Sequence, residues 1–339
     1  MRIGITYDLK SDAPRPADAP DDWQEEFDSP ATIEAIAAVL RGRGHTVEKL
    51  GDGRPLLERL LRDPPDFVFN FAEGQGVGRS REARVPAVLE MLGIPYTGSD
   101  PLTLAVTLDK DCAKRLVASA GVAVPHGVVA APDDELLQRA TGNGALAFPL
   151  IVKPAWEGSS KGIRARSLVD DQNELEEAVA VQWRDHRQPA LVEEYIAGDE
   201  LTVGVIGNED PRIIGIMRVL PRRANGRFVY SLEVKRDYLR QVDYECPARL
   251  PAEATERVEQ AARAVYRVLG CRDVARIDFR LRDGVPYFLE VNPLPGLNPE
   301  SSDLVILARL AGWSYPQLIT SILDAALERT GKSAAAAPI

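Results

Sequence analysis

The sequence predicts a protein of mixed α/β and α+β architecture in three domains: an N-terminal domain built on a parallel sheet, and two α+β domains. The chain has 339 residues, well above the roughly 150 residues of a typical domain. Its first third alternates apolar strand-like runs with helical segments, whereas its last third is rich in strands and turn signals. With 45% hydrophobic and 27% charged residues, the composition is that of a globular protein.

Residues 1–105 are predicted to form the N-terminal α/β domain. Residues 2–7 alternate small and apolar side chains, as a buried strand does, and a polar, Pro-rich loop follows. Pro30 opens an Ala-rich helix, since proline suits the first helical turn. Further strands at 46–50 and 67–71 flank a helix at 54–61. This βαβαβ order predicts a parallel sheet covered by helices.

Residues 106–190 are predicted to form a small central α+β domain. An amphipathic helix is expected over 108–121, and a buried strand over 149–153 ends at Lys153. A loop containing glycine and serine follows as far as Gly162. A long charged helix over 171–186 closes the domain.

Residues 191–330 are predicted to form the third domain, and 331–339 a flexible tail. The expected elements alternate strands with turns, then add a helix, a hairpin and two closing helices. They comprise strands at 190–195 and 200–206, turns at Gly207-Asn208 and Asn225-Gly226, a helix at 253–269, a hairpin at 273–292 and closing helices up to Arg329.

Charge and composition exclude several functional classes. The net charge of −10 and the pI near 5.1 argue against binding nucleic acid or an anionic membrane, because both require a basic surface. No segment approaches the roughly 18 apolar residues of a membrane span, and no signal-like stretch opens the chain, so we expect a cytoplasmic protein. The three cysteines and three histidines are isolated in sequence, which disfavours a disulfide framework, a zinc site and a histidine-based triad.

The predicted hairpin carries the strongest chemical signal. A turn at Asp283-Gly284, with period-two alternation, places Asp278 opposite Glu290 and Arg276 opposite Asn292. Facing carboxylates repel each other, so the pair favours a bound cation. Two carboxylates beside an amide suit Mg²⁺ that completes its shell with phosphate oxygens and water. The alternative is a solvated strand face on which Arg276 neutralises the acids.

A second signal is Lys153 with the loop that follows it. A lysine that ends a buried strand needs a charged partner, and the loop offers backbone N–H groups and hydroxyls to the same place. This combination cradles a phosphate. Residues 158–162 also match the G-x-S-x-G hydrolase elbow, but a strand-like segment follows instead of a helix and only His186 lies downstream as a base. We therefore reject a hydrolase.

These motifs, together with three further segments, resemble the ATP-grasp superfamily and, within it, the D-alanine–D-alanine ligase family. The further segments are 192–196, 93–99 and 108–110, and the likeness covers nearly the whole chain in the right order. The resemblance implies a three-domain ATP-grasp fold whose second and third domains clasp ATP with two Mg²⁺ ions. It also implies amino-acid substrates and a homodimer.

The resemblance assigns roles to individual residues. Asp278, Glu290 and Asn292 match the Mg²⁺ ligands, in agreement with the hairpin argument. Taken singly, Lys110 could instead be a solvated helix residue, and Glu193, Glu194 and Glu200 could be ordinary surface acids. The remaining matches are Lys110 and Lys153 on the phosphates, Glu157, Gly158, Ser159 and Ser160 in the loop over them, Lys235 near the terminal phosphate, Glu193, Glu194, Tyr195 and Ile196 at the adenine edge, and Glu200 at the ribose hydroxyls.

The implied reaction needs no nucleophilic side chain. An amino-acid carboxylate attacks the γ-phosphate, and the amine of a second substrate attacks the resulting acyl phosphate. Lys110, Lys153 and Lys235 would stabilise charge at the phosphoryl group, and Arg276 the oxyanion of the second step. Because water would hydrolyse the acyl phosphate, we expect a lid over 222–238, for which a plain surface hairpin is the alternative.

The substrate end departs from the family pattern at two places. Arg236 stands where the family usually has tyrosine after the lid lysine, which leaves Glu26 and Ser159 for the other roles in the network around the first substrate. A His-Gly entry is replaced by residues 70–74, and a charged run follows. Here we expect the first substrate's extra charged group to meet Glu73, Arg79 and Arg81, and the second substrate's carboxylate to meet Asn298, Ser301 and Ser302. The alternative for the charged run is a solvated helix face.

Three functions therefore compete. The chain is a D-alanine ligase, a related ligase that joins other amino acids or a specialised metabolite, or a nucleotide-binding protein that has lost catalysis. The third is disfavoured because Lys153, Arg276 and the three metal-ligand positions are all present. We expect an ATP-dependent carboxylate–amine ligase.

Overall fold

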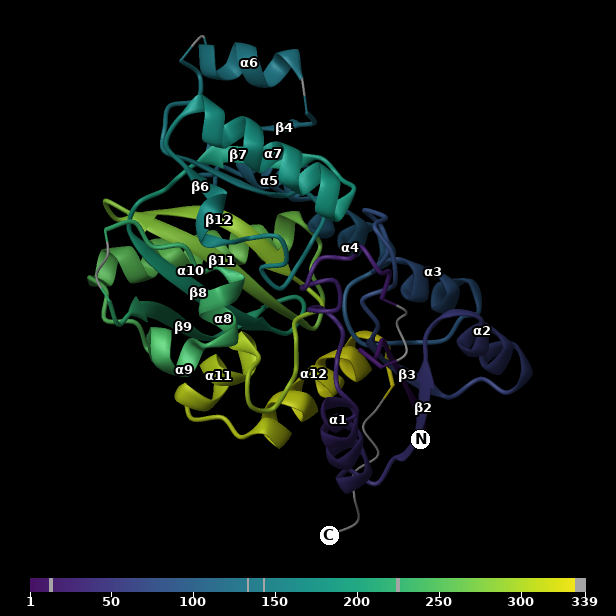
Figure 1. Ribbon diagram of the computed structural model, residues 1–339. Helices are drawn as coiled ribbons and strands as arrows, with labels where there is room; N and C mark the ends of the chain where they lie inside the picture. Colours follow the sequence, from purple (N-terminus) through teal and green to yellow (C-terminus); the bar gives the residue numbers. More distant parts are fainter. Residues whose placement is uncertain (12–14, 133, 143, 224–225, 333–339) are drawn as a thin grey trace.

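The computed structural model describes residues 1–11, 15–132, 134–142, 144–223 and 226–332. Three sheets organise the chain (Figure 1), one of them parallel and the other two antiparallel. Helices pack against each sheet. The predicted combination of α/β and α+β architecture is confirmed.

The first sheet is parallel and has the strand order β2-β1-β3. The Ser29 side chain begins the first helix by accepting a hydrogen bond from the backbone N of Thr32, and Pro30 occupies the first turn. The predicted βαβαβ order is confirmed, and one helix after the third strand was not expected. The elements are β1 (Arg2–Tyr7), α1 (Pro30–Gly42), β2 (Thr46–Gly51), α2 (Gly53–Arg62), β3 (Phe67–Phe71) and the additional α3 (Arg84–Met91).

The second sheet is antiparallel with the order β4-β7-β5-β6. Two helices precede it: the second corresponds to the helix predicted over 108–121, and the first was not predicted. Asp109 has extended backbone and caps the second helix by accepting from Cys112 N, so the chain breaks there and Lys110 becomes the first helical residue. The elements are α4 (Pro101–Leu108), α5 (Lys110–Ser119), β4 (Gly127–Ala130), α6 (Glu135–Gly142), β5 (Leu150–Pro154), the 3₁₀ helix η1 (Ala165–Ser167), β6 (Leu168–Val169), α7 (Gln172–His186) and β7 (Ala190–Glu194).

The third sheet is antiparallel with the order β10-β9-β8-β11-β12. The predicted hairpin is confirmed, and its turn residues Asp283 and Gly284 both have positive φ, as a tight hairpin turn requires. The elements are β8 (Asp199–Ile206), β9 (Arg212–Pro221), α8 (Leu232–Arg236), α9 (Tyr238–Gln241), β10 (Val242–Glu245), α10 (Ala252–Val268), β11 (Val274–Arg282), β12 (Val285–Asn292), α11 (Asp303–Leu310) and α12 (Tyr315–Arg329).

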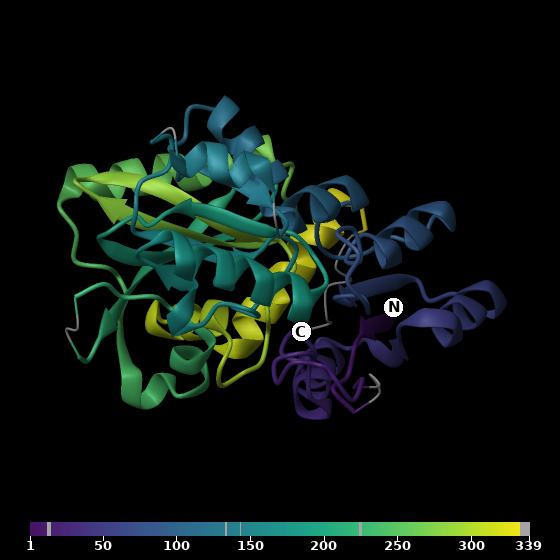
Figure 2. The ribbon, with the colours of Figure 1, turned by 45° about the horizontal axis from the view of Figure 1, so that its top comes forward.

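The largest core cluster joins the two ends of the chain. Ile3 of β1 and Ile33 of α1 belong to the same buried cluster as Leu304 of α11 and Leu318 of α12. Figure 1 shows α12 beside α1, and Figure 2 shows the yellow C-terminal helices between the purple N-terminal part and the green sheet. The closing helices therefore hold the parallel sheet against the third sheet.

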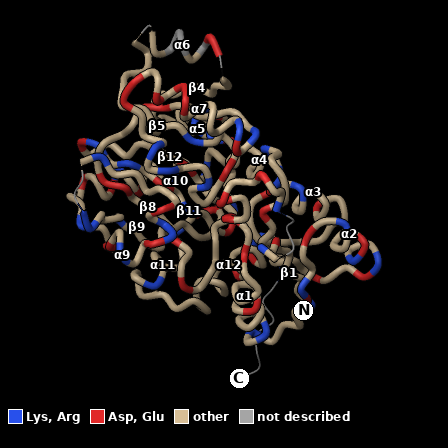
Figure 3. The backbone as a smooth tube through the Cα atoms, in the orientation of Figure 1, with Lys and Arg blue, Asp and Glu red and all other residues tan. Residues whose placement is uncertain are grey.

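Charge is spread over the molecule. In Figure 3, Lys and Arg segments alternate with Asp and Glu segments along the tube. No helix in the described ranges has the length and apolarity needed to cross a membrane. Asn225 of one predicted turn and residues 333–339 of the predicted tail lie outside the described residues.

Candidate functional site

The β11–β12 hairpin brings the predicted metal ligands together. Arg276 pairs with Asn292 and Asp278 with Glu290, which confirms the predicted register. Arg276 Nη2 lies 2.9 Å from Asp278 Oδ2 and 3.3 Å from Glu290 Oε1. The Arg276 side chain is only 8% exposed, so these ion pairs form in a poorly hydrated place where charge interactions are strong.

The two carboxylates experience different fields. Burial alone would raise the pKa of Glu290, but the ammonium of Lys110 and the guanidinium of Arg276 outweigh it and hold that pKa below its usual value. Burial raises the pKa of Asp278, and the Glu290 charge adds to the rise while Arg276 opposes it. Positive charge is therefore concentrated near Glu290 more than near Asp278.

The donor set of this hairpin fits Mg²⁺. Asp278 and Glu290 offer carboxylate oxygens, and Asn292, opposite Arg276 on the same hairpin, offers its side-chain amide oxygen. Across the described part of the chain, no group of three or more His, Cys, Asp and Glu side chains gathers that could hold a metal. A metal at this hairpin would therefore complete its shell with water and phosphate oxygens, as Mg²⁺ does.

Three lysines point to the same region from α5 and β5. Lys153, at the end of β5, forms an ion pair with Glu193 of the adjacent strand β7. Lys110 Nζ lies 3.4 Å from Glu290 Oε2 and donates to the backbone oxygen of Glu157. Lys114, which sequence reasoning missed, lies 2.9 Å from Glu193 Oε2. Its spacing of four residues from Lys110, which puts both on one helix face, was the available signal.

A first cavity collects most of the predicted nucleotide-binding residues. Sequence reasoning missed Arg280, which ion-pairs with Glu200 at 2.7 Å and lies 5.4 Å from the centre of the Tyr195 ring. Arg276, Asp278 and Arg280 are two residues apart and therefore share one face of β11, and this pattern could have identified Arg280 from the sequence. The predicted residues that line this cavity are Lys153, Ser160, Glu193, Glu194, Tyr195, Ile196, Glu200, Lys235, Asp278 and Glu290.

The loop after β5 closes a second, narrower cavity. Ser159 and Ser160 have φ of 50° and 57°, a left-handed conformation that serine seldom adopts and that is concentrated at functional sites. Gly158 N donates to Glu26 Oε1, so the loop reaches the N-terminal domain. The second cavity is lined by Glu157, Gly158 and Ser159 of this loop, with Lys110, Arg276, Glu290 and Asn292.

Arg81 lies beneath this loop between two carboxylates. Its Nη2 is 2.8 Å from Glu26 Oε2 and 3.1 Å from Glu157 Oε2, and its side chain is 1% exposed. Burial would raise the pKa of Glu26, but Arg81 and Lys161 hold it at about 2. Arg81 is therefore occupied by protein carboxylates, whereas Arg79 lies in an exposed position with its Nη1 3.4 Å from Asp109 Oδ2.

A third cavity, of about 260 Å³, holds the predicted substrate residues. The Asn298 side chain stabilises the wall of this cavity, because it donates a hydrogen bond to Thr32 Oγ1 and accepts one from Ser301 N. Asp303 was missed: it lies 3.4 Å from Lys235 Nζ and 3.6 Å from Arg276 Nη1. The predicted residues lining this cavity are Glu26, Glu73, Ser159, Lys235, Arg236, Arg276, Asn298, Ser301 and Ser302.

The three cavities adjoin. Glu290 lines the first and second, whereas Ser159 and Arg276 line the second and third. Lys235 and Asp303 line the first and third. A molecule in one cavity therefore lies beside a molecule in the next, with Arg276 and Glu290 at the junction.

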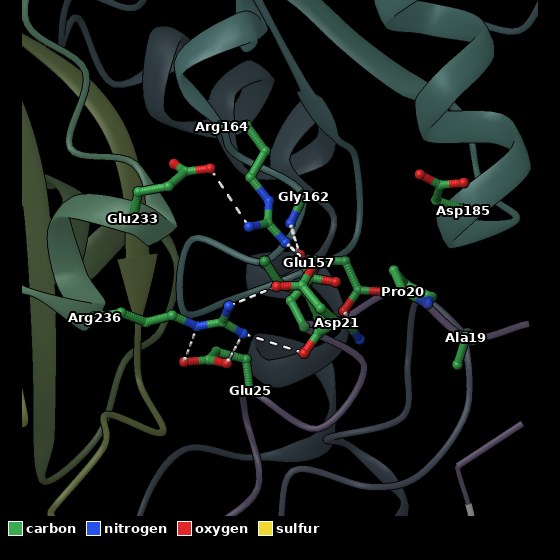
Figure 4. A network of polar contacts seen from close by, with 12 residues as sticks. Ala19, Pro20, Asp21, Glu25, Glu157, Gly162, Arg164, Asp185, Glu233 and Arg236 are labelled. Carbon is green, nitrogen blue, oxygen red and sulfur yellow. Dashed lines mark hydrogen bonds and ion pairs between the residues drawn. The ribbon is translucent and has the colours of Figure 1, made fainter. Parts of the chain in front are cut away.

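Arg236 attaches α8 to residues 15–28, which we name the N-terminal strap. Its guanidinium lies 2.6 Å from Asp21 Oδ2 and 2.7 Å from Glu25 Oε2, and Figure 4 shows these contacts. Arg164 also contacts Asp21, and it lies 3.4 Å from Glu233 of α8. A cavity of about 480 Å³ beyond this network contains none of the predicted site residues.

Comparisons with known proteins agree with this geometry. The family model described as D-ala D-ala ligase C-terminus matches residues 116–324. The uncharacterized protein y4sG of Sinorhizobium fredii is 36% identical over 306 residues, 87% of each chain. The D-alanine–D-alanine ligase of Moorella thermoacetica is 33% identical, covering 87% of this chain and 93% of its own. The ATP-bound D-alanine–D-alanine ligase of Bacillus anthracis superposes with a TM-score of 0.73 at 26% identity, over 98% of this chain and 100% of its own.

Proposed function

Because this chain belongs to the D-alanine–D-alanine ligase family of ATP-grasp ligases, we propose that it joins the carboxylate of one amino acid to the amine of another at the expense of ATP. The observation that carries the proposal is the junction at Arg276 and Glu290, where a cavity lined by the predicted ATP residues meets one lined by phosphate-loop and metal-site residues and, beyond it, one lined by the predicted substrate residues. Such a junction suits the transfer of a phosphoryl group between neighbouring ligands.

The first step forms an acyl phosphate. A substrate carboxylate oxygen attacks the γ-phosphorus of ATP, the bond to the β-phosphate oxygen breaks, and ADP leaves. Lys110, Lys153 and Lys235 would stabilise the charge that spreads over the phosphoryl oxygens, and their positions around the first two cavities support this role. Mg²⁺ held by Asp278, Glu290 and Asn292 would neutralise further phosphate charge.

The second step forms the amide. The amine of the second substrate, having lost a proton, attacks the acyl carbon, and phosphate leaves. Arg276, at the junction of the cavities, would stabilise the oxyanion of the tetrahedral intermediate. Ser159 and the strained loop around it would exclude water from the acyl phosphate.

A ligase for amino acids other than D-alanine is the second candidate. Two features favour it: Arg236 replaces the family's usual tyrosine and is bound to Asp21 and Glu25, and Arg81 neutralises Glu26. Both changes lie beside the third cavity, and neither alters the residues of the first cavity. They would therefore change the substrate while retaining ATP.

A phosphate-release assay tests the proposal. The protein is supplied with ATP, Mg²⁺ and a panel of amino acids that includes D- and L-alanine, and the product is identified by mass. Turnover with D-alanine alone supports the family's named activity, and turnover with another pair supports the second candidate. The absence of phosphate release with every pair would contradict ligase function.

Two further proposals remain: the resemblance implies a homodimer, and the isolated cysteines suit a protein of the cytoplasm. The three cysteines are all free in the structure, which suits a reducing compartment. Sedimentation equilibrium tests the first, with a mass near the 37.1 kDa of one chain as the contradicting result. Fractionation of the source cells tests the second.

A further inference from the structure

We propose that Glu73 and Glu82 bind a cationic side chain of one substrate, so that this ligase acts on an amino acid with a second amino group or another basic side chain. This inference rests on the proposed ligase function and specifies its substrate class. Both glutamates line the second cavity together with Ser159 and Arg276, and Glu73 also lines the third. Glu73 therefore borders the cavity assigned to the substrates, and Glu82 borders the cavity that adjoins it.

Glu82 is a buried carboxylate without a partner. Its side chain belongs to a residue that is 8% exposed, and no ion pair or hydrogen bond reaches it from the described residues. Glu73, which is partly buried, likewise has no ion pair among them. An isolated carboxylate removed from water is strongly unfavourable unless a charge meets it. The nearest cations, Arg81 and Lys110, do not offset the burial of Glu82, and the pKa of both carboxyl groups is raised. Both groups therefore hold protons in the unliganded protein, and a ligand that brings cationic groups would release these protons and pair with the carboxylates.

Most cations around these cavities are paired with other acids. Arg81 holds Glu26 and Glu157, Lys110 lies beside Glu290, and Lys235 beside Asp303. Arg236 holds Asp21 and Glu25, and Arg276 lies among Asp278, Glu290 and Asp303. Lys10 forms no ion pair among the described residues, but it lines only the third cavity, so the second cavity offers Glu73 and Glu82 no cation of their own.

An ordinary amino acid brings a single cation to these two carboxyl groups. Both glutamates line the second cavity, and burial together with the Glu82 and Glu26 charges raises the pKa of Glu73 well above its usual value. One α-ammonium would pair with one of the two carboxyl groups. The second carboxylate then calls for a second cationic group on the same ligand.

An organic cation fits better than a metal ion. No third His, Cys, Asp or Glu joins Glu73 and Glu82 to form a metal-binding group in the described ranges. The cavities are also continuous with the region of Arg276, where a substrate's own carboxylate would be activated. A basic amino acid would thus place its cationic groups at the glutamates and its carboxylate toward the hairpin.

Isothermal titration of the protein, saturated with Mg²⁺ and a non-hydrolysable ATP analogue, tests the inference. The ligands are lysine and ornithine of both chiralities, compared with the uncharged norleucine and norvaline. We expect a basic amino acid to bind at least about tenfold more tightly than its uncharged counterpart. In Glu82→Gln and in Glu73→Gln the preference should fall below about threefold, whereas Glu209→Gln, an exposed control, should retain it.

Equal affinity for charged and uncharged ligands, a preference that survives both substitutions, or no amino-acid binding at all would overturn the inference while the analogue still binds. If the ATP analogue itself does not bind, the proposed ligase function fails, and this inference fails with it. The titration of the analogue, made first, separates the two cases.

Discussion

Arg81 is a fully buried guanidinium whose charge is shared by Glu26 and Glu157. The three side chains come from segments far apart in the sequence, since Arg81 is 55 residues from Glu26 and 76 from Glu157. Each is costly to bury alone, and together they neutralise one another. This group of charges therefore ties the N-terminal strap, the segment after β3 and the loop after β5 to one another.

We predict that Arg81→Gln lowers the free energy of unfolding by about 3–5 kcal/mol, because two buried carboxylates lose their cation. Urea denaturation measures the change. Arg79→Gln is the matched control, since Arg79 is exposed, and it should change stability by less than about 0.5 kcal/mol. Equal effects of the two substitutions would show that the buried ion pairs do not stabilise the fold.

Glu82 gives a pH-dependent prediction. Burial raises its pKa to about 8 in the folded protein, whereas the unfolded chain releases the proton near pH 4–5. Folding therefore retains a proton that the unfolded chain has lost, and stability falls as the pH rises through this window. Relative to the wild type, Glu82→Gln should gain at least about 1 kcal/mol between pH 5 and pH 8. A stability difference independent of pH, measured by urea denaturation, would contradict this.

Among the elements, the β11–β12 hairpin and its Asp283-Gly284 turn could be predicted, and so could the pairing of Asp278 with Glu290. The register shift between Asp278 and Phe279 could not, since regular pairing from this turn would place Asp278 opposite Leu289. Helix α4, before the capping residue Asp109, could not be predicted, because the expected helix began only at residue 108. Helix α3 was missed for a different reason: the charged run before it was interpreted as a substrate-binding segment. Local sequence patterns therefore predicted the positions of the strands more accurately than the ends of the helices.

The contact between α8 and the N-terminal strap leads to a prediction about selectivity. Arg236→Tyr removes the ion pairs to Asp21 and Glu25 beside the third cavity, but it leaves the first cavity unchanged. We expect relative kcat/KM values among first substrates to change by about tenfold or more, and the KM for ATP by less than about threefold. Arg240→Tyr, an exposed substitution on α9, is the control. An unchanged substrate profile would remove Arg236 from the substrate pocket.

Over the whole molecule, the order of the motifs along the chain was enough to predict that they meet at one site. What it could not predict is how charges from distant segments pair. The sequence predicts that Arg81 binds a substrate, but in the structure its partners come from the N-terminal strap and from the loop after β5. Asp303 was missed because it lies outside the hairpin and approaches Arg276 only in the folded chain.

The junction of the cavities also predicts which residues are indispensable. Asp278→Asn or Glu290→Gln should lower phosphate release by about 100-fold or more at saturating ATP, because each removes a carboxylate oxygen from the proposed metal site. Part of the loss should be recovered at high Mg²⁺. Asp243→Asn, a substitution of an exposed residue on β10, should retain full activity. Retained activity in both hairpin variants would remove Mg²⁺ from the hairpin.

The account depends most on one claim, that ATP activates a substrate carboxylate at the junction beside Arg276. The direct test supplies an accepted amino acid labelled with ¹⁸O in its carboxylate and analyses the released phosphate by mass spectrometry. Attack of the carboxylate on the γ-phosphorus transfers one labelled oxygen to each phosphate. Phosphate whose new oxygen comes only from water would show that ATP is hydrolysed without carboxylate activation, and would contradict the account.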